Sequence, residues 1–85
     1  MNMNTMKAYE EIVDFIAAGT TPNRVITYQP SEAAKARVAD LIYREKNTGL
    51  TPDEKSELDH YMELEHIMRL AKARAHQYVN HEQLH

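Results

Sequence analysis

The chain has 85 residues, 42% of them hydrophobic and 27% charged, with no cysteine and a net charge of −3. Such a chain forms one domain at most and buries only about 60% of the surface its unfolded form exposes, which favours pairing with a second subunit. The length excludes Rossmann and TIM-barrel enzymes, and the lack of cysteine excludes disulfides and thiolate metal sites. No long apolar run predicts a membrane span or a signal peptide, so we expect a cytoplasmic protein.

Residues 5–18 predict a short helix. Tyr9, Ile12, Val13 and Ile16 recur at three- and four-residue spacing and so form one apolar stripe. Gly19 follows as the residue that ends the helix.

Residues 24–29 predict an extended segment or single strand. Their sequence, Arg-Val-Ile-Thr-Tyr-Gln, is rich in β-branched and aromatic residues, and Pro30 stops it. Nothing else in the chain is expected to be extended. The segment therefore pairs with its copy in a dimer, adds to a partner's sheet, or is an extended strap.

Two further helices are predicted, over residues 31–46 and 52–79. Ser31 is a favourable N-cap for the first of them. Thr51, Pro52 and Glu54 form a capping-box pattern at the start of the second. Residues 80–85 predict a frayed tail. The fold class is thus a mainly α domain: a short helix, one extended segment, and a helical hairpin with a long second arm.

The long helix is apolar on more than one side, and this predicts that a second subunit covers part of it. We expect a homodimer. The residues predicted to form its interface are Leu64, Ile67, Met68 and Ala71.

Acidic residues concentrate at the start of the long helix: six acids and one base lie within residues 53–65. One interpretation is that these acids complement the helix dipole. The other is an acidic surface that meets a basic protein partner. The residues expected to contact that partner are Glu57, Asp59, Glu63 and Glu65.

No motif for catalysis is present, and we expect neither an enzyme nor a cofactor. Glu-x-x-His occurs twice, from Glu57 to His60 and from Glu63 to His66, a spacing that is found in di-iron helical bundles. By helical phase the two motifs do not share one face, so no metal site is predicted, and a metal-binding helical dimer is the least favoured of the functions considered.

An alternative function is DNA binding. A strand followed by two helices is the order of ribbon-helix-helix repressors, whose paired strands enter the major groove. Arg24, Thr27 and Gln29 would then contact bases. The acidic net charge and the single base in this segment argue against that alternative.

Five segments together resemble a known family; they are residues 15–20, 30–32, 44–46, 49–54 and 64–74. The chain resembles a family of small bacterial proteins, mostly cyanobacterial, whose members are often encoded beside an HNH-type endonuclease. The resemblance implies an antitoxin-like protein that inhibits a partner nuclease. It supplies no catalytic or ligand residue.

Overall fold

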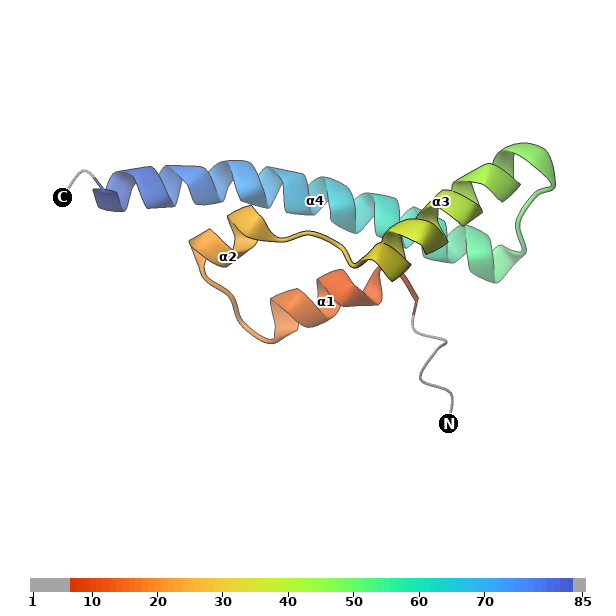
Figure 1. Ribbon diagram of the computed structural model, residues 1–85, viewed down its shortest axis with the longest axis horizontal. Coiled ribbons are helices and arrows are strands. Elements are labelled where there is room, and N and C mark those ends of the chain that lie inside the picture. Colours follow the sequence, from red (N-terminus) through yellow and green to blue (C-terminus); the bar gives the residue numbers. More distant parts are fainter. Residues whose placement is uncertain (1–6, 84–85) are drawn as a thin grey trace.

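The computed structural model describes residues 7–83 of the chain, and this part is helical, with no strand in it. Its four helices are α1 (Glu10–Ala17), α2 (Pro22–Thr27), α3 (Glu32–Asn47) and α4 (Pro52–Gln83). Figure 1 shows α4 as a long rod, with α3 crossing its first half and the shorter helices beside its length. The mainly α fold class and the helical hairpin with a long second arm are confirmed.

Helix α1 begins later than predicted, at Glu10, because residues 7–9 form a turn; residues 5 and 6 lie outside the described part. Its end agrees with the prediction. Gly19 follows the C-cap Ala18 with a φ of 85°, a conformation that glycine adopts without strain.

The predicted strand at residues 24–29 is wrong, because Pro22–Thr27 form helix α2. Thr21 caps this helix by accepting a hydrogen bond from the backbone N–H of Arg24 at 3.3 Å, and Pro22 occupies the first turn. These start signals outweigh the β-propensity of Val25 and Ile26. Within residues 24–29 the chain becomes extended after the helix, where Tyr28 has a ψ of 134°.

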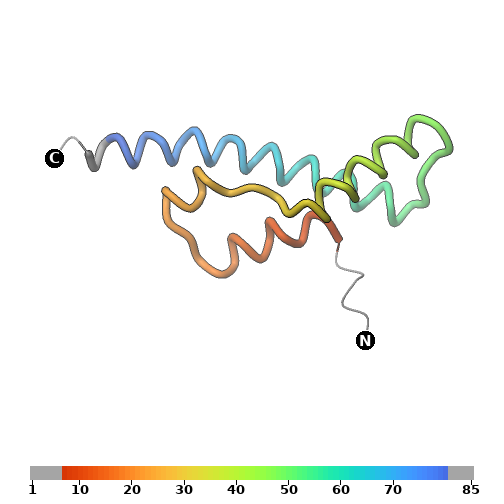
Figure 2. The backbone as a smooth tube through the Cα atoms, in the orientation of Figure 1, coloured from red at the N-terminus to blue at the C-terminus, as the bar shows by residue number. Residues whose placement is uncertain are grey.

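The chain from α1 to the start of α3 runs out, turns and returns, as Figure 2 shows. Glu11 of α1 holds the two ends of this segment together, because it accepts hydrogen bonds from the backbone N–H and the hydroxyl of Ser31. Lys72 of α4 donates to the carbonyl oxygen of Tyr28 at 2.6 Å, and the rings of Phe15 and Tyr28 lie 4.7 Å apart. The segment between α1 and α3 is thereby attached to the second half of α4.

Both predicted caps of the hairpin are confirmed. The Ser31 hydroxyl accepts from the Ala34 N–H at 3.0 Å. Thr51 and Glu54 form the reciprocal capping box, with distances of 3.1 Å and 3.0 Å. Between the helices, Gly49 has a φ of 89°. Helix α4 continues to Gln83, so the predicted helix end at residue 79 is too early, while the fraying of the tail stays a prediction; residues 84–85 lie outside the described part.

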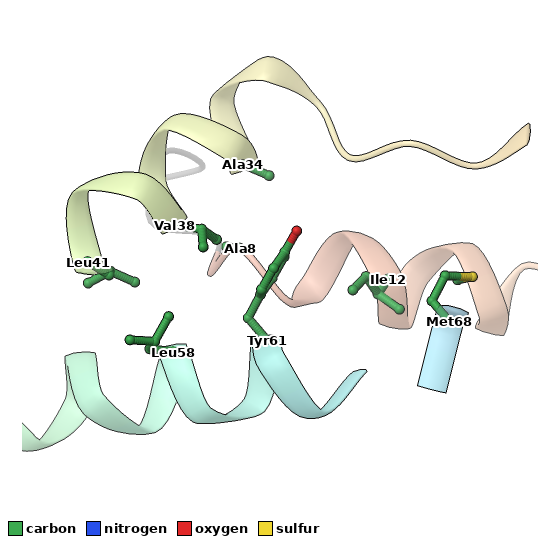
Figure 3. Close-up of a cluster of buried hydrophobic side chains, with 8 residues drawn as sticks. All are labelled: Ala8, Ile12, Ala34, Val38, Leu41, Leu58, Tyr61 and Met68. Carbon is green, nitrogen blue, oxygen red and sulfur yellow. The ribbon is translucent and has the colours of Figure 1, made fainter. Parts of the chain in front are cut away.

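The core lies between α3, α1 and one face of α4. Figure 3 shows Leu58 of α4 directed toward Val38 and Leu41 of α3, while Met68 lies near Ile12 of α1. Ile12 is 2% exposed and Leu41 is fully buried. This core fixes which side of α4 remains available to solvent.

Candidate protein-interaction surface

Helix α4 has one face that packs on its own chain. The buried apolar residues on this face recur at three- and seven-residue spacing; they are Leu58, Tyr61, Met68 and Ala75. Met68 is 6% exposed, so its predicted place in a dimer interface is wrong: its side chain is already covered by the core. Leu64 and Ala71, also predicted there, are half-buried.

A second face of α4 carries exposed apolar side chains. Ile67 is 49% exposed and Leu70 is 59% exposed, although both are large aliphatic residues. Glu63 and Arg74, both exposed, lie one helical turn before and after them. At about 100° per residue, this face points about 150° away from the buried one. We call Glu63, Ile67, Leu70 and Arg74 the α4 strip.

The ends of the α4 strip carry opposite charges. Neither Glu63 nor Arg74 forms an ion pair with any residue in the part of the chain that the structure describes. Two other acid–base pairs lie within this helix: Lys55 bonds to Asp59 at 3.3 Å, and Arg69 to Glu65 at 3.1 Å. The strip therefore offers an apolar centre flanked by one free carboxylate and one free guanidinium.

Helix α1 adds further exposed apolar residues. Val13 is 43% exposed and Ile16 is 52% exposed. Both share a face of α1 with Tyr9, whose ring lies 5.1 Å from the ring of His60 on α4. This face of α1 therefore borders α4 on the side of His60.

The four acids predicted to contact a partner do not form one surface. Glu57 is 3% exposed and cannot reach a partner, so this part of the prediction is wrong. Asp59 and Glu63 share the outer face of α4 by their four-residue spacing, whereas Glu65 lies on the opposite side of the helix, next to the core.

Glu57 instead links parts of the fold through its hydrogen bonds. Its carboxylate accepts from Nη2 and Nε of Arg37, at 2.9 Å and 3.1 Å, and from the backbone N–H of Ala8 at 3.1 Å. The hydrogen bonds from Arg37 hold the pKa of Glu57 below its ordinary value of 4.5, although burial acts in the opposite direction. This carboxylate joins α3, α4 and the segment before α1.

No metal-binding cluster forms in the described residues: none of their His, Asp and Glu side chains gather in groups of three or more. The Nδ1 atom of His60 lies 2.7 Å from the carbonyl oxygen of Ser56. Because Arg37 occupies both carboxylate oxygens of Glu57, the Glu57–His60 pair is not arranged as a ligand pair.

A small cavity lies between α1, α4 and the link that follows α2. Its volume is about 100 Å³, well below the roughly 300–1,000 Å³ of typical ligand sites. The Tyr28 hydroxyl is buried and has no hydrogen-bond partner among the described residues, and burial raises the pKa of both Tyr28 and Tyr61. The residues lining the cavity are Ile12, Tyr28, Pro30, Tyr61, Glu65, Met68, Arg69 and Lys72. At about 100 Å³, the cavity is smaller than a cofactor requires.

The residues predicted to read DNA lie on or beside α2. The Arg24 guanidinium lies over the Phe15 ring at 5.8 Å, and the Thr27 hydroxyl donates to the carbonyl oxygen of Asn23 at 3.1 Å. Gln29 is exposed beyond the helix. They are therefore not presented by a strand, as the ribbon-helix-helix alternative requires.

Comparisons with known proteins add no relative: no family model, curated protein or solved structure matches the chain. Within the described residues, none of the helices is both long enough and apolar enough to cross a membrane.

Proposed function

We propose that this protein is a protein-interaction module that binds another protein chain through the α4 strip. The observation that carries the proposal is the exposure of Ile67 and Leu70 on the side of α4 turned away from the core. Adjacent large apolar side chains on an otherwise polar helix face are typical of helix-docking surfaces. The flanking Glu63 and Arg74 would select a partner with a base opposite one end and an acid opposite the other.

We propose further that this protein inhibits a nuclease, as the family resemblance implies, and that acidic residues outside the α4 strip make the contact. A nuclease presents cationic groups to phosphates, and acids on an inhibitor are complementary to them. The hairpin end of the molecule has such acids. Glu45 and Asp59 share the single ammonium of Lys55, both at 3.3 Å, which leaves one negative charge unbalanced. The Asp59 side chain is 61% exposed.

A cleavage assay tests this second proposal. An HNH-type endonuclease of the kind that the family resemblance implies would be purified, and its cleavage of plasmid DNA measured with increasing amounts of this protein. We expect inhibition near equimolar protein, and at least a tenfold loss of inhibition for Asp59→Lys. Asp40→Lys is the matched control, because Asp40 is also ion-paired, at 3.0 Å to Arg44, and is 54% exposed. Uninhibited cleavage at excess wild-type protein would exclude this nuclease as the target.

The ribbon-helix-helix alternative needs a strand at residues 24–29, and helix α2 occupies most of that segment.

A further inference from the structure

We propose that the partner of the α4 strip is a second copy of this chain, with the two α4 helices packed antiparallel. This inference rests on the proposed interaction function and names the chain that fills the surface. In the pairing, Ile67 of each copy contacts Leu70 of the other, and Glu63 of each copy forms an ion pair with Arg74 of the other.

The spacing of the residues in the α4 strip suits a second copy of the same helix. Glu63, Ile67, Leu70 and Arg74 follow one another at intervals of four, three and four residues, so the interval series is the same read in either direction. A two-fold axis between Ile67 and Leu70 therefore superimposes the strip on itself with the helix direction reversed. Intervals of three and four are also those at which one helix packs along another in a coiled coil. The strip is thus self-complementary in shape, as a two-fold dimer interface requires.

The charges select the antiparallel orientation. A parallel pairing in register places Glu63 against Glu63 and Arg74 against Arg74, which is repulsive. The antiparallel pairing exchanges them, so that each free carboxylate meets a free guanidinium and two ion pairs flank the apolar centre. Neither side chain has an ion-pair partner within its own chain among residues 7–80.

The distribution of charge along α4 also favours the antiparallel orientation. Six acids and one base lie in residues 53–65, whereas Arg69, Lys72 and Arg74 follow without an acid among residues 66–81. An antiparallel pair places the acidic half of each α4 beside the basic half of the other. A second copy therefore supplies both the apolar and the ionic complement.

A charge-swap series measured by sedimentation equilibrium tests the proposal. The wild type is expected to dimerise. Glu63→Arg and Arg74→Glu each replace two ion pairs with two repulsive contacts, so each should raise the dimer dissociation constant about tenfold or more. The double variant E63R/R74E restores both pairs and should return the constant to near the wild-type value. A wild type that stays monomeric, or a double variant weaker than either single one, would overturn the proposal.

Cross-linking then tests the orientation, since the chain has no native cysteine. Oxidation of a mixture of Glu63→Cys and Arg74→Cys chains should give mainly the mixed disulfide dimer. A disulfide dimer that forms as readily from Glu63→Cys alone would show a parallel pair and overturn the proposal. A monomeric wild type whose Ile67→Asp variant loses inhibition of the endonuclease would refute the second copy and leave the proposed function standing.

Discussion

Arg37 of α3 and Glu57 of α4 form a bidentate ion pair at the edge of the core, with nitrogen–oxygen distances of 2.9 Å and 3.1 Å. The Glu57 side chain is 4% exposed and that of Arg37 is 40% exposed. The same carboxylate accepts the backbone N–H of Ala8. A single buried charge thus joins three separate segments of the chain, and its neutralisation depends on one residue.

Replacing Arg37 should destabilise the fold. Arg37→Ala leaves the Glu57 carboxylate buried without its counter-ion, which costs about 2 kcal/mol once the partial exposure of Arg37 is taken into account. Chemical denaturation followed by circular dichroism measures the change. The control is Lys35→Ala on the same helix, which removes an exposed pair to Glu32 and should change stability by less than about 0.5 kcal/mol. Equal effects of the two substitutions would contradict this role for Glu57.

Stability should fall in acid. Because the folded state holds the pKa of Glu57 below 4.5, the contribution of this carboxylate is complete above pH 4.5 and is lost as the pH falls through the folded-state pKa. The pKa of Glu54 is lowered as well, first by its hydrogen bond from the Thr51 backbone. Thermal melts between pH 7 and pH 2 measure the loss. Glu57→Gln should flatten the dependence but not abolish it, since Glu54 remains; an unchanged dependence in this variant would contradict the assignment.

The turn between α3 and α4 should require glycine. Gly49 has a φ of 89°, and a Cβ atom added there would meet nothing within 4 Å. The cost of Gly49→Ala is therefore conformational rather than steric, about 1 kcal/mol. Gly49→Asn should cost less, because asparagine tolerates this region better. Denaturant midpoints should therefore fall from the wild type to Gly49→Asn and again to Gly49→Ala. A Gly49→Ala variant as stable as the wild type would contradict this requirement for glycine.

Most of the helical fold could be predicted from the sequence, because its caps are local signals. The failure at α2 is instructive, since Thr21 and Pro22 repeat the start pattern of Thr51 and Pro52. Six residues rich in β-branched side chains are too short for helical periodicity to emerge. The contact of Tyr28 with Phe15 and the bond to Lys72, which hold the segment against α1 and α4, come from distant positions. A local pattern carries no signal of these contacts.

The candidate surface was predicted only in part. Periodicity indicates that α4 is apolar on more than one side, but it does not tell which side the same chain covers. Met68 lies in the core, whereas Ile67, its neighbour in sequence, is half exposed. The role of Arg37 was missed because its partner Glu57 lies twenty residues away on another helix. One available signal was an acid among the apolar positions of α4, which requires a counter-ion when buried.

The most direct test of the interaction surface compares two aspartate substitutions by light scattering across a concentration series. Ile67→Asp places a charge at the centre of the α4 strip, whereas Met62→Asp places it at a similarly exposed position outside the strip; their native side chains are 49% and 42% exposed. Both variants should keep the helical content of the wild type. We expect Ile67→Asp to be monomeric and Met62→Asp to dimerise like the wild type. Equal dimerisation of all three proteins would show that the α4 strip is not the interface.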